Sequence, residues 1–481
     1  MTAGLPAPRP PRDAVVGLIV NPVAGLGGAA GLKGSDGARI QREALARGAT
    51  PRAGERAARA VRALLARRPG TRVVTVPGPM GEDSARAAGA SFTLVRPAPA
   101  PADAGTPETD LPAGIGTPGA DLPAGAGTPG ADLPAGVATT ARDTRLAVGA
   151  LADVDLLLFA GGDGTARDVL DAVGALGDQA PPVLGIPAGV KVYSGCFAVS
   201  PAAAGLLAAD HLSAAEAGLR RGAGTAVPAD PDPAQSDPAT PGPATPGPAT
   251  PGPATPGPDV PGTVEAEVVD LDEERYRQGQ VSPRLYGILR VPAARAGLSG
   301  RKAGSSGIGP ATVEGIAREV VARMRPGVRY VLGPGATTQA VGRALGLATT
   351  LLGVDVVESG ETGVLVAGDV AEPELLALVA GREAVVVLSV IGGQGFVLGR
   401  GNQQISPRVL DAVIGYGDAA ARRLLVVSTP QKLAALRGRP LLADSGDEDL
   451  DRKLSGHVQV ITGYRESTIY QICTASEEFH G

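Results

Sequence analysis

The chain has 481 residues, which is enough for two or three domains with a core each. Its 44 Lys and Arg against 49 Asp and Glu give a net charge of −5, and 5 Phe, 7 Tyr and no Trp provide few stacking surfaces, so nucleic-acid binding is disfavoured. Cys196 and Cys473 form no CxxC pair, the histidines lack metal-ligand spacing, and no apolar run reaches membrane-span length, which excludes a disulfide scaffold, structural zinc and a membrane anchor.

Apolar runs of strand length alternate with helical segments in the first part of the chain. Strands are predicted at 14–20, 72–76, 155–160 and 182–186, and helices at 54–67, 83–90, 140–152 and 166–173. Thr140, with Asp143 three positions later, resembles a capping box at a helix start. Buried strands joined by helices indicate a parallel sheet covered on both faces. We therefore predict an α/β domain at 1–206.

Two low-complexity tracts interrupt this alternation. The first, at about 97–138, repeats a unit that starts at Gly105, Gly116 and Gly127, and the second repeats Pro-Ala-Thr-Pro-Gly within a linker at 207–262. Proline removes hydrogen-bond donors and glycine raises the entropic cost of ordering, so neither tract can offset its folding cost by apolar burial. We predict two disordered surface inserts, and a Pro-rich motif that binds a partner is the alternative.

The alternation returns in the second half of the chain. A small, partly antiparallel β element is predicted at 263–308, and a second α/β unit at 309–445. The strands of that unit are expected at 328–332, 350–357, 384–391 and 423–428, and its helices at 312–324, 337–345 and 372–379. We expect 446–481 to be a polar C-terminal tail, with His457 and His480 as tail residues.

The strongest local signal is the run Gly161-Gly162-Asp163-Gly164-Thr165, which follows a buried strand and opens a helix. Glycines let backbone N–H groups approach a phosphate, and the helix N-terminus adds partial positive charge. A carboxylate beside a phosphate is costly unless it accepts a proton from an attacking hydroxyl or helps to hold Mg²⁺. Asp163 is therefore the candidate catalytic residue. The alternative is an Asx-type turn in which Asp163 only caps the helix.

This run, together with the turn Asn21-Pro22-Val23-Ala24-Gly25, looks like the signature of the superfamily that contains NAD kinases, diacylglycerol kinases and 6-phosphofructokinases. With the segments 139–144, 185–191 and 193–195 added, the chain resembles the ATP-NAD kinase family, in the branch named for the acetoin-catabolism X protein. The resemblance covers 14–201 and 263–436. It implies an N-terminal parallel-sheet domain like that of NAD kinases and diacylglycerol kinases.

The resemblance also implies a reaction, the transfer of a phosphoryl group from ATP, or from another donor such as polyphosphate, to the adenosine 2′-hydroxyl of NAD. NAD and ATP are thus the implied partners and Mg²⁺ the implied cofactor. Asp163 would orient or deprotonate the hydroxyl. Gly161, Gly162, Gly164 and Thr165 would hold the donor phosphates, and the turn from Asn21 to Gly25 would face the same site.

One departure from the family pattern leaves the acceptor open. Standard NAD kinases carry a later Asn-Glu or Asn-Asp pair that holds the NAD ribose, and no such pair occurs here in a comparable context. A kinase of the same fold that acts on a lipid, a sugar or a small metabolite is therefore a second interpretation. A nucleotide-binding accessory protein without catalysis is a third. For each of them we expect a cytoplasmic protein with neither a nucleic-acid nor a membrane partner, and a homo-oligomer is compatible with the sequence.

Three further features complete the candidate site. Lys191 follows an expected strand, where it could neutralise a transferring phosphate or simply be a surface lysine. In the second unit, Gly333 and Gly335 form one strand-to-helix turn, and Gly392, Gly393 and Gly395 form another. Each turn could cradle a phosphate, although the geometry of a turn alone also requires glycine. If both units serve one reaction, we expect these turns to face Asp163 across a common cleft.

Overall fold

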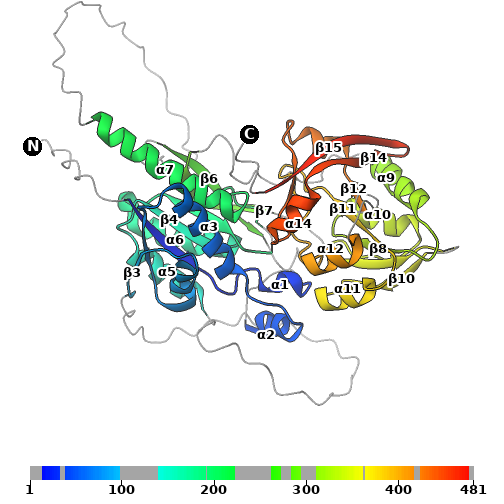
Figure 1. Cartoon of the computed structure of the whole chain (residues 1–481), viewed down its shortest axis with the longest axis horizontal. Coiled ribbons are helices and arrows are strands. Elements are labelled where there is room, and N and C mark those ends of the chain that lie inside the picture. The colour runs from blue at the N-terminus through cyan, green and yellow to red at the C-terminus, as the bar shows by residue number, and fades with distance from the viewer. Residues whose placement is uncertain are drawn as a thin grey trace, which may run out of the picture.

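The computed structural model describes residues 14–32, 38–97, 139–190, 192–222, 262–271, 283–293, 310–360, 363–415 and 423–475. Nearly all of the first low-complexity tract and every Pro-Ala-Thr-Pro-Gly repeat lie outside these ranges, so their disorder stays a prediction. The described chain forms two α/β units that lie side by side, the first coloured blue to green and the second yellow to red (Figure 1).

The first unit is built on a parallel sheet of five strands in the order β3-β2-β1-β4-β5. The strands are β1 (Val15–Val20), β2 (Arg72–Thr75), β3 (Phe92–Leu94), β4 (Leu156–Gly161) and β5 (Val183–Pro187). Every residue of β4 is buried, as expected of a central strand that is covered on both faces. The chain leaves β1 in one direction toward β2 and β3, and β4 and β5 lie on the other side. The sheet therefore has its topological switch point between β1 and β4.

Helices cover both faces of this sheet. They are α1 (Leu26–Ala29), α2 (Ala38–Ala46), α3 (Ala53–Arg67), α4 (Glu82–Ala87), α5 (Ala141–Ala150), α6 (Asp163–Leu176) and α7 (Pro201–Gly222). Because successive strand residues point to opposite faces, Leu18 packs in the cluster with α3 and α7, and Ile19 packs in the cluster with α5 and α6. The predicted capping box at α5 is confirmed, with both Thr140 and Asp143 hydrogen bonds present.

A linker was predicted from residue 207 onward, whereas the chain there continues the helix α7 to Gly222. Its alanine-rich stretch packs closely on α3 instead. A Cβ at Gly205 would lie 2.1 Å from the carbonyl oxygen of Ala60, so the two helices approach through a glycine. A hairpin of β6 (Thr263–Leu271) and β7 (Pro283–Pro292) forms the predicted small antiparallel element and contacts α6 and β5.

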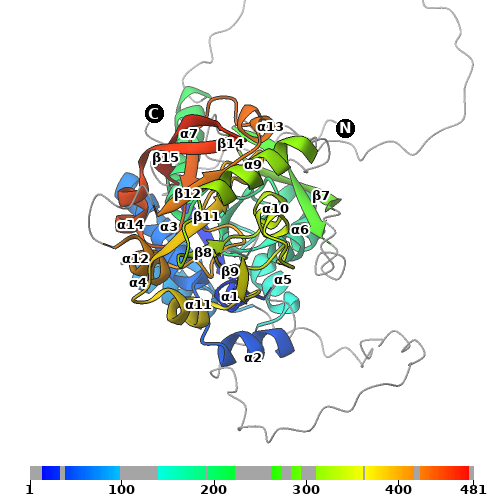
Figure 2. The ribbon, with the colours of Figure 1, turned by 90° about the vertical axis from the view of Figure 1, so that its right-hand side faces the viewer.

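The second unit holds a mixed sheet of eight strands in the order β10-β9-β8-β11-β12-β14-β15-β13. The strands are β8 (Arg329–Leu332), β9 (Asp355–Glu358), β10 (Val364–Ala367), β11 (Ala384–Ser389), β12 (Leu424–Val427), β13 (Leu441–Ala443), β14 (Gly456–Gly463) and β15 (Glu466–Thr474). The helices are α9 (Pro310–Arg323), α10 (Ala336–Ala344), α11 (Glu372–Val379), α12 (Pro407–Ile414), α13 (Pro430–Ala434) and α14 (Glu448–Leu454). Figure 2 shows α9 and α10 on one face of this sheet and α11 and α12 on the other.

The expected polar tail at 446–481 is wrong for its described part, which forms α14, β14 and β15. Val460, Ile461 and Ile472 are buried, while polar residues occupy the exposed positions of the hairpin. That alternation is the period of a half-buried strand, and the high polar content concealed it. His457 lies in β14, opposite Gln471. His480 is outside the described residues.

The two units share apolar contacts. Phe396, Leu442 and Ala475 of the second unit belong to the same buried cluster as Val20 and Val199 of the first. The interface is therefore packed as a core and is not a loose contact between domains. No helix in the described ranges is both long and apolar enough to cross a membrane.

Candidate active site

Two glycine-rich turns meet at the switch point of the first sheet. The strands β1 and β4 are parallel neighbours, so the residues that follow them emerge side by side. The Asn21 N–H donates to the carbonyl oxygen of Ala160 at 2.9 Å. Its side-chain Nδ2 donates to Oγ1 of Thr165 at 3.0 Å. The structure thus joins the Asn21 turn to the Gly161–Thr165 turn, as the sequence predicted.

A third turn, after β5, closes on the same point. The N–H groups of Ala188 and Gly189 both donate to the carbonyl oxygen of Gly161, at 2.8 and 2.9 Å. Gly25 has a φ of +77°, and a Cβ there would lie 2.0 Å from the carbonyl oxygen of Ala188. Close backbone approach therefore requires glycine at position 25. Lys191, predicted to serve this site, lies outside the described residues.

The helix α6 begins at Asp163, three residues earlier than predicted. Gly162 is its N-cap, in an extended conformation and without a side-chain cap, and Gly164 lies in its first turn. At the end of β4, a Cβ at Gly161 would lie 2.4 Å from the side chain of Thr165. The N-terminus of α6 therefore has no side-chain cap at Gly162, and the first N–H groups of a helix have no partner within the helix itself.

The Asp163 carboxylate binds a loop outside its own helix. Its Oδ1 accepts hydrogen bonds from the Ser194 N–H at 2.9 Å and the Ser194 hydroxyl at 2.7 Å. The Tyr193 N–H donates to both carboxylate oxygens, at 3.1 and 2.9 Å. Four such contacts stabilise the ionised carboxylate. Asp163 thus anchors a loop 30 residues away in sequence, a role that the Asx-turn interpretation did not include.

The carboxylate also affects the ionisation of its neighbours. Burial raises the pKa of the Tyr193 phenol well above its usual value, and the negative charge of Asp163 raises it further. Burial, and then the same charge, raise the pKa of the Cys196 thiol. Both side chains therefore stay protonated at neutral pH, and Cys196 is not poised as a nucleophile.

One glycine turn of the second unit reaches this loop. The turn Gly392–Gly395 follows β11. It is closed by a hydrogen bond in which the Gly395 N–H donates to the carbonyl oxygen of Ile391 at 2.9 Å. Gly393 and Gly395 have φ values of 80° and 82°, which favour glycine. Gln394 is buried, and its Nε2 donates to the carbonyl oxygen of Val192 at 3.0 Å. This turn therefore contacts the loop that Asp163 holds.

The other glycine turn lies elsewhere on the second sheet. Gly333 follows β8 and donates to the carbonyl oxygen of Val387, and Gly335 is the N-cap of α10. Near it, Lys432 Nζ donates to Ser389 Oγ at 3.1 Å. Since β8 and β11 are parallel neighbours, both glycine turns leave the same edge of the sheet. No contact described between the units involves Gly333 or Gly335.

A polar segment of the second unit, not predicted to belong to the site, contacts the first unit directly. Arg400, Asn402 and Gln404 are each at most 6 % exposed, and Gln403 Nε2 donates to the carbonyl oxygen of Val190 at 2.7 Å. The available signal was the polar run at 400–404 directly after an apolar stretch. Buried polar residues require partners, which the first unit supplies.

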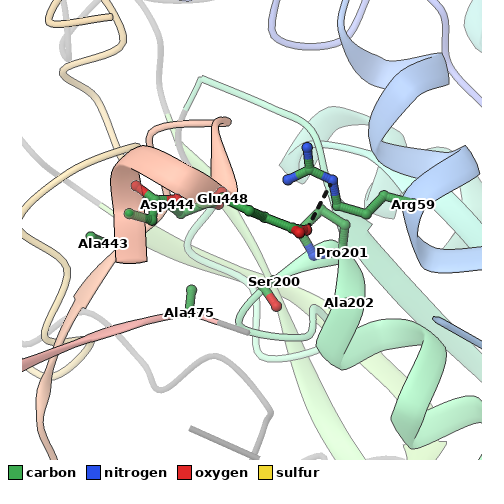
Figure 3. A pocket seen from close by; sticks show the side chains of 9 residues that line it. Arg59, Ser200, Pro201, Ala202, Ala443, Asp444, Glu448 and Ala475 are labelled. Carbon is green, nitrogen blue, oxygen red and sulfur yellow. Dashed lines mark ion pairs between the residues drawn. The ribbon is translucent and has the colours of Figure 1, made fainter. Parts of the chain in front are cut away.

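A small, shallow pocket opens beside this interface (Figure 3). Its lining comes from the start of α7, the end of β13 and α14, with Arg59 paired to Glu448 across it. The pocket is lined by none of the glycine turns. We therefore assign it no substrate.

The pocket residue Asp451 gives a pH-dependent prediction. Burial raises its pKa to about 6, helped by the charges of Asp444 and Asp447 and opposed by hydrogen bonds from Ser445. The pKa of Asp451 is higher in the folded protein than its unfolded value near 4. Ionisation of this group therefore lowers the free energy of unfolding as the pH rises from the unfolded pKa to the folded pKa. We expect Asp451→Asn to raise the free energy of unfolding at pH 8 by about 1–3 kcal/mol, and by much less at pH 4.5. Urea unfolding at both pH values measures this, and an equal effect at both would contradict it.

Comparisons with known proteins agree with this geometry. Residues 16–215 match the family model of the ATP-NAD kinase N-terminal domain, and residues 325–472 match that of the ATP-NAD kinase C-terminal domain. Comparison with curated proteins and comparison with solved structures each gave no match. Each match covers one of the two units, and the first includes all three turns around Asp163.

Proposed function

The chain belongs to the ATP-NAD kinase family, and from this premise we propose that it transfers a phosphoryl group from ATP to the adenosine 2′-hydroxyl of NAD. The observation that carries the proposal is the meeting of three turns, after β1, β4 and β5, around the start of α6. The switch point of an open α/β sheet is where such folds bind nucleotides. The acceptor and the residue roles below are parts of the proposal.

The donor phosphates would lie against the backbone of the Gly161–Gly164 turn. There the N–H groups of the first turn of α6 and the helix dipole favour an anion. Thr165 is held by Asn21, so its hydroxyl is fixed beside that turn. Positioning and electrostatic stabilisation account for most of the catalysis of phosphoryl transfer, and a rigid backbone cradle contributes to both.

Asp163 would act on the acceptor side. Its existing hydrogen bonds hold the carboxylate in place, which suits a group that accepts a hydrogen bond from the attacking hydroxyl and orients it. Tyr193 and Ser194 donate hydrogen bonds to this carboxylate, so the loop and the carboxylate hold each other in place. We propose orientation of the hydroxyl as the main role of Asp163.

A magnesium ion fits this donor set only as a partner of ATP. No group of three or more His, Cys, Asp or Glu side chains in the described ranges could hold a metal ion. Mg²⁺ in nucleotide enzymes is commonly held by one or two carboxylates together with phosphates. Asp163 would be such a carboxylate, and bound Mg²⁺ neutralises charge on the transferring phosphate. The residues of this chain then supply the backbone cradle and the oriented hydroxyl.

The second unit would provide the acceptor half of the site. The Gly392–Gly395 turn touches the Asp163 loop through Gln394, so a dinucleotide could contact both units at once. The Gly333–Gly335 turn lies at the same edge of the second sheet. Together with Lys432, which is hydrogen-bonded to Ser389, it would bind a second phosphate. We propose that these turns bind the acceptor, and Lys191 the transferring phosphate.

A second candidate function keeps the kinase and changes the acceptor. The sequence lacks the Asn-acidic pair that holds the NAD ribose in standard NAD kinases. This departure favours a lipid, a sugar or a small metabolite in place of NAD. The phosphoryl donor site would be unchanged.

Transfer of radiolabelled phosphate from ATP to a panel of acceptors tests the proposal. The panel contains NAD, NADH, a diacylglycerol, sugars and simple alcohols, each with Mg²⁺. We expect label on NAD above all other acceptors. Label on another acceptor alone would support the second candidate, and label on none would leave a nucleotide-binding protein without catalysis.

A further inference from the structure

The segment 187–200, which the structure describes except at Lys191, connects β5 to α7 and is held by both units. From the first unit, Asp163 binds its middle at Tyr193 and Ser194. From the second unit, Gln403 and the Gly401 N–H bind the carbonyl oxygen of Val190 at 2.7 and 3.0 Å. The position of this loop, and with it the position of Asp163, therefore depends on the second unit.

The two ends of the segment are bound by arginines. Arg56 of α3 donates from Nε to the carbonyl oxygen of Pro187 at 2.5 Å. Arg400 of the second unit donates from Nη2 to the carbonyl oxygen of Val199 at 3.0 Å. Arg400 is 5 % exposed and lies over the ring of Phe396, with its Cζ 4.6 Å from the centroid. Each end of the segment is thus fixed by a guanidinium group.

One carboxylate serves both arginines. Asp444 follows β13 in the second unit, and its side chain is 5 % exposed. It accepts hydrogen bonds from Nη2 of Arg56 at 2.5 Å and from Nη1 at 3.3 Å, and it lies 3.9 Å from Nη2 of Arg400. A buried carboxylate beside one buried and one partly buried guanidinium group compensates charges that would otherwise be very costly. Asp444 therefore orients both arginines.

We infer that Asp444 is a positioning residue, which through Arg56 and Arg400 fixes the segment 187–200 and thereby the Asp163 loop against the second unit. Its effect on turnover rests on the proposed function. Its effect on the segment does not, because the contacts exist whichever acceptor is used. The substitution Asp444→Asn keeps the shape and removes the charge, so the two guanidinium groups lose their shared anion.

Cys196 gives a readout of the segment that is independent of activity. It lies within the segment, is fully buried and is a free thiol. A thiol reagent can label it only when the segment opens. In a Cys473→Ser background, we expect Asp444→Asn to raise the rate of labelling at Cys196 by about tenfold or more. We also expect it to lower kcat for NAD by about tenfold, with the KM for ATP changed less than about twofold.

Glu448→Gln is the matched control. Glu448 forms another ion pair between the units, with Arg59 one turn beyond Arg56 (Figure 3), and no hydrogen bond or ion pair described for it involves the segment. In Glu448→Gln, the labelling rate of Cys196 and the kcat should stay within about twofold of those of the parent. Equal labelling rates in Asp444→Asn and the parent, or an equal increase in both variants, would overturn the inference.

If Asp444→Asn does not fold, Arg56→Lys tests the same link. Lysine keeps the charge but cannot contact Pro187 and both oxygens of Asp444 at once. We expect faster labelling of Cys196 in this variant too, and an unchanged rate would overturn the inference. If the parent does not phosphorylate NAD, the proposed function fails, and the labelling rates still decide the role of Asp444.

Discussion

Asp163→Asn is expected to lower turnover by roughly 10²-fold or more, the scale of a lost group that handles the reacting proton. Asparagine has a single acceptor oxygen, and its amide nitrogen would face N–H groups where the carboxylate now accepts from Tyr193 and Ser194. The substitution therefore disturbs both the loop and the hydrogen bond to the attacking hydroxyl. Steady-state kinetics of the purified variant, with ATP affinity measured separately, provide the test.

Asp168→Asn is the matched control for that variant. Asp168 lies in α6, as Asp163 does, and forms an ion pair with Arg145 of α5. We expect its turnover to stay within about twofold of the parent. Unimpaired turnover of Asp163→Asn would falsify the role of Asp163, and an equal loss in Asp168→Asn would show that the helix alone is responsible.

The second large effect is expected for Gly25→Ala. An alanine Cβ would lie 2.0 Å from the carbonyl oxygen of Ala188, so the turn after β5 must shift away from the Gly161 turn. Left-handed backbone strain costs about 1–2 kcal/mol, and overpacking adds about 1–3 kcal/mol. We expect the free energy of unfolding to fall by about 2–5 kcal/mol, together with most of the ATP affinity.

Gly89→Ala measures the cost of backbone strain without the cost of overpacking. Gly89 has a φ of +72°, close to that of Gly25, but a Cβ there would meet nothing within 4 Å. Its substitution should cost only the backbone strain, about 1–2 kcal/mol, and leave ATP binding intact. Urea unfolding and ATP titration of both variants measure this. Equal losses in the two variants would mean that close approach at Gly25 does not shape the site.

The central elements of the first unit could be predicted because their signals are local. The strands β1, β4 and β5 are short, continuous apolar runs, and the Gly161–Thr165 turn sits between a buried strand and a helix, as expected. Parallel pairing of β1 with β4 then brings the Asn21 turn beside it. Local pattern and sheet topology together were sufficient for this part of the candidate site.

The contacts that complete the site depend on tertiary packing. Asp163 finds its partners 30 and 31 residues away, and Arg56 finds Asp444 388 residues away. No periodicity or motif relates such positions, so the sequence indicated the carboxylate but not the donors around it. The same is true of Arg400 and Gln403, whose partners are carbonyl oxygens of the first unit.

The errors in the fold have a common cause. The helix α7 and the hairpin β14–β15 lie in segments whose composition, alanine-rich in one and polar in the other, resembles a linker or a tail. In both, burial of one face against a neighbouring element decides the structure. For α7 the neighbour is α3, and for the hairpin it is the second sheet.

The central claim is that this chain makes NADP from NAD and ATP, and its most direct test is detection of NADP itself. The purified chain is incubated with NAD, ATP and Mg²⁺, and NADP is measured with a dehydrogenase that accepts NADP but not NAD. We predict ATP-dependent formation of NADP by the parent chain, and about 1 % of that rate in Asp163→Asn. No NADP from the parent chain, or the same rate in both proteins, would contradict the account.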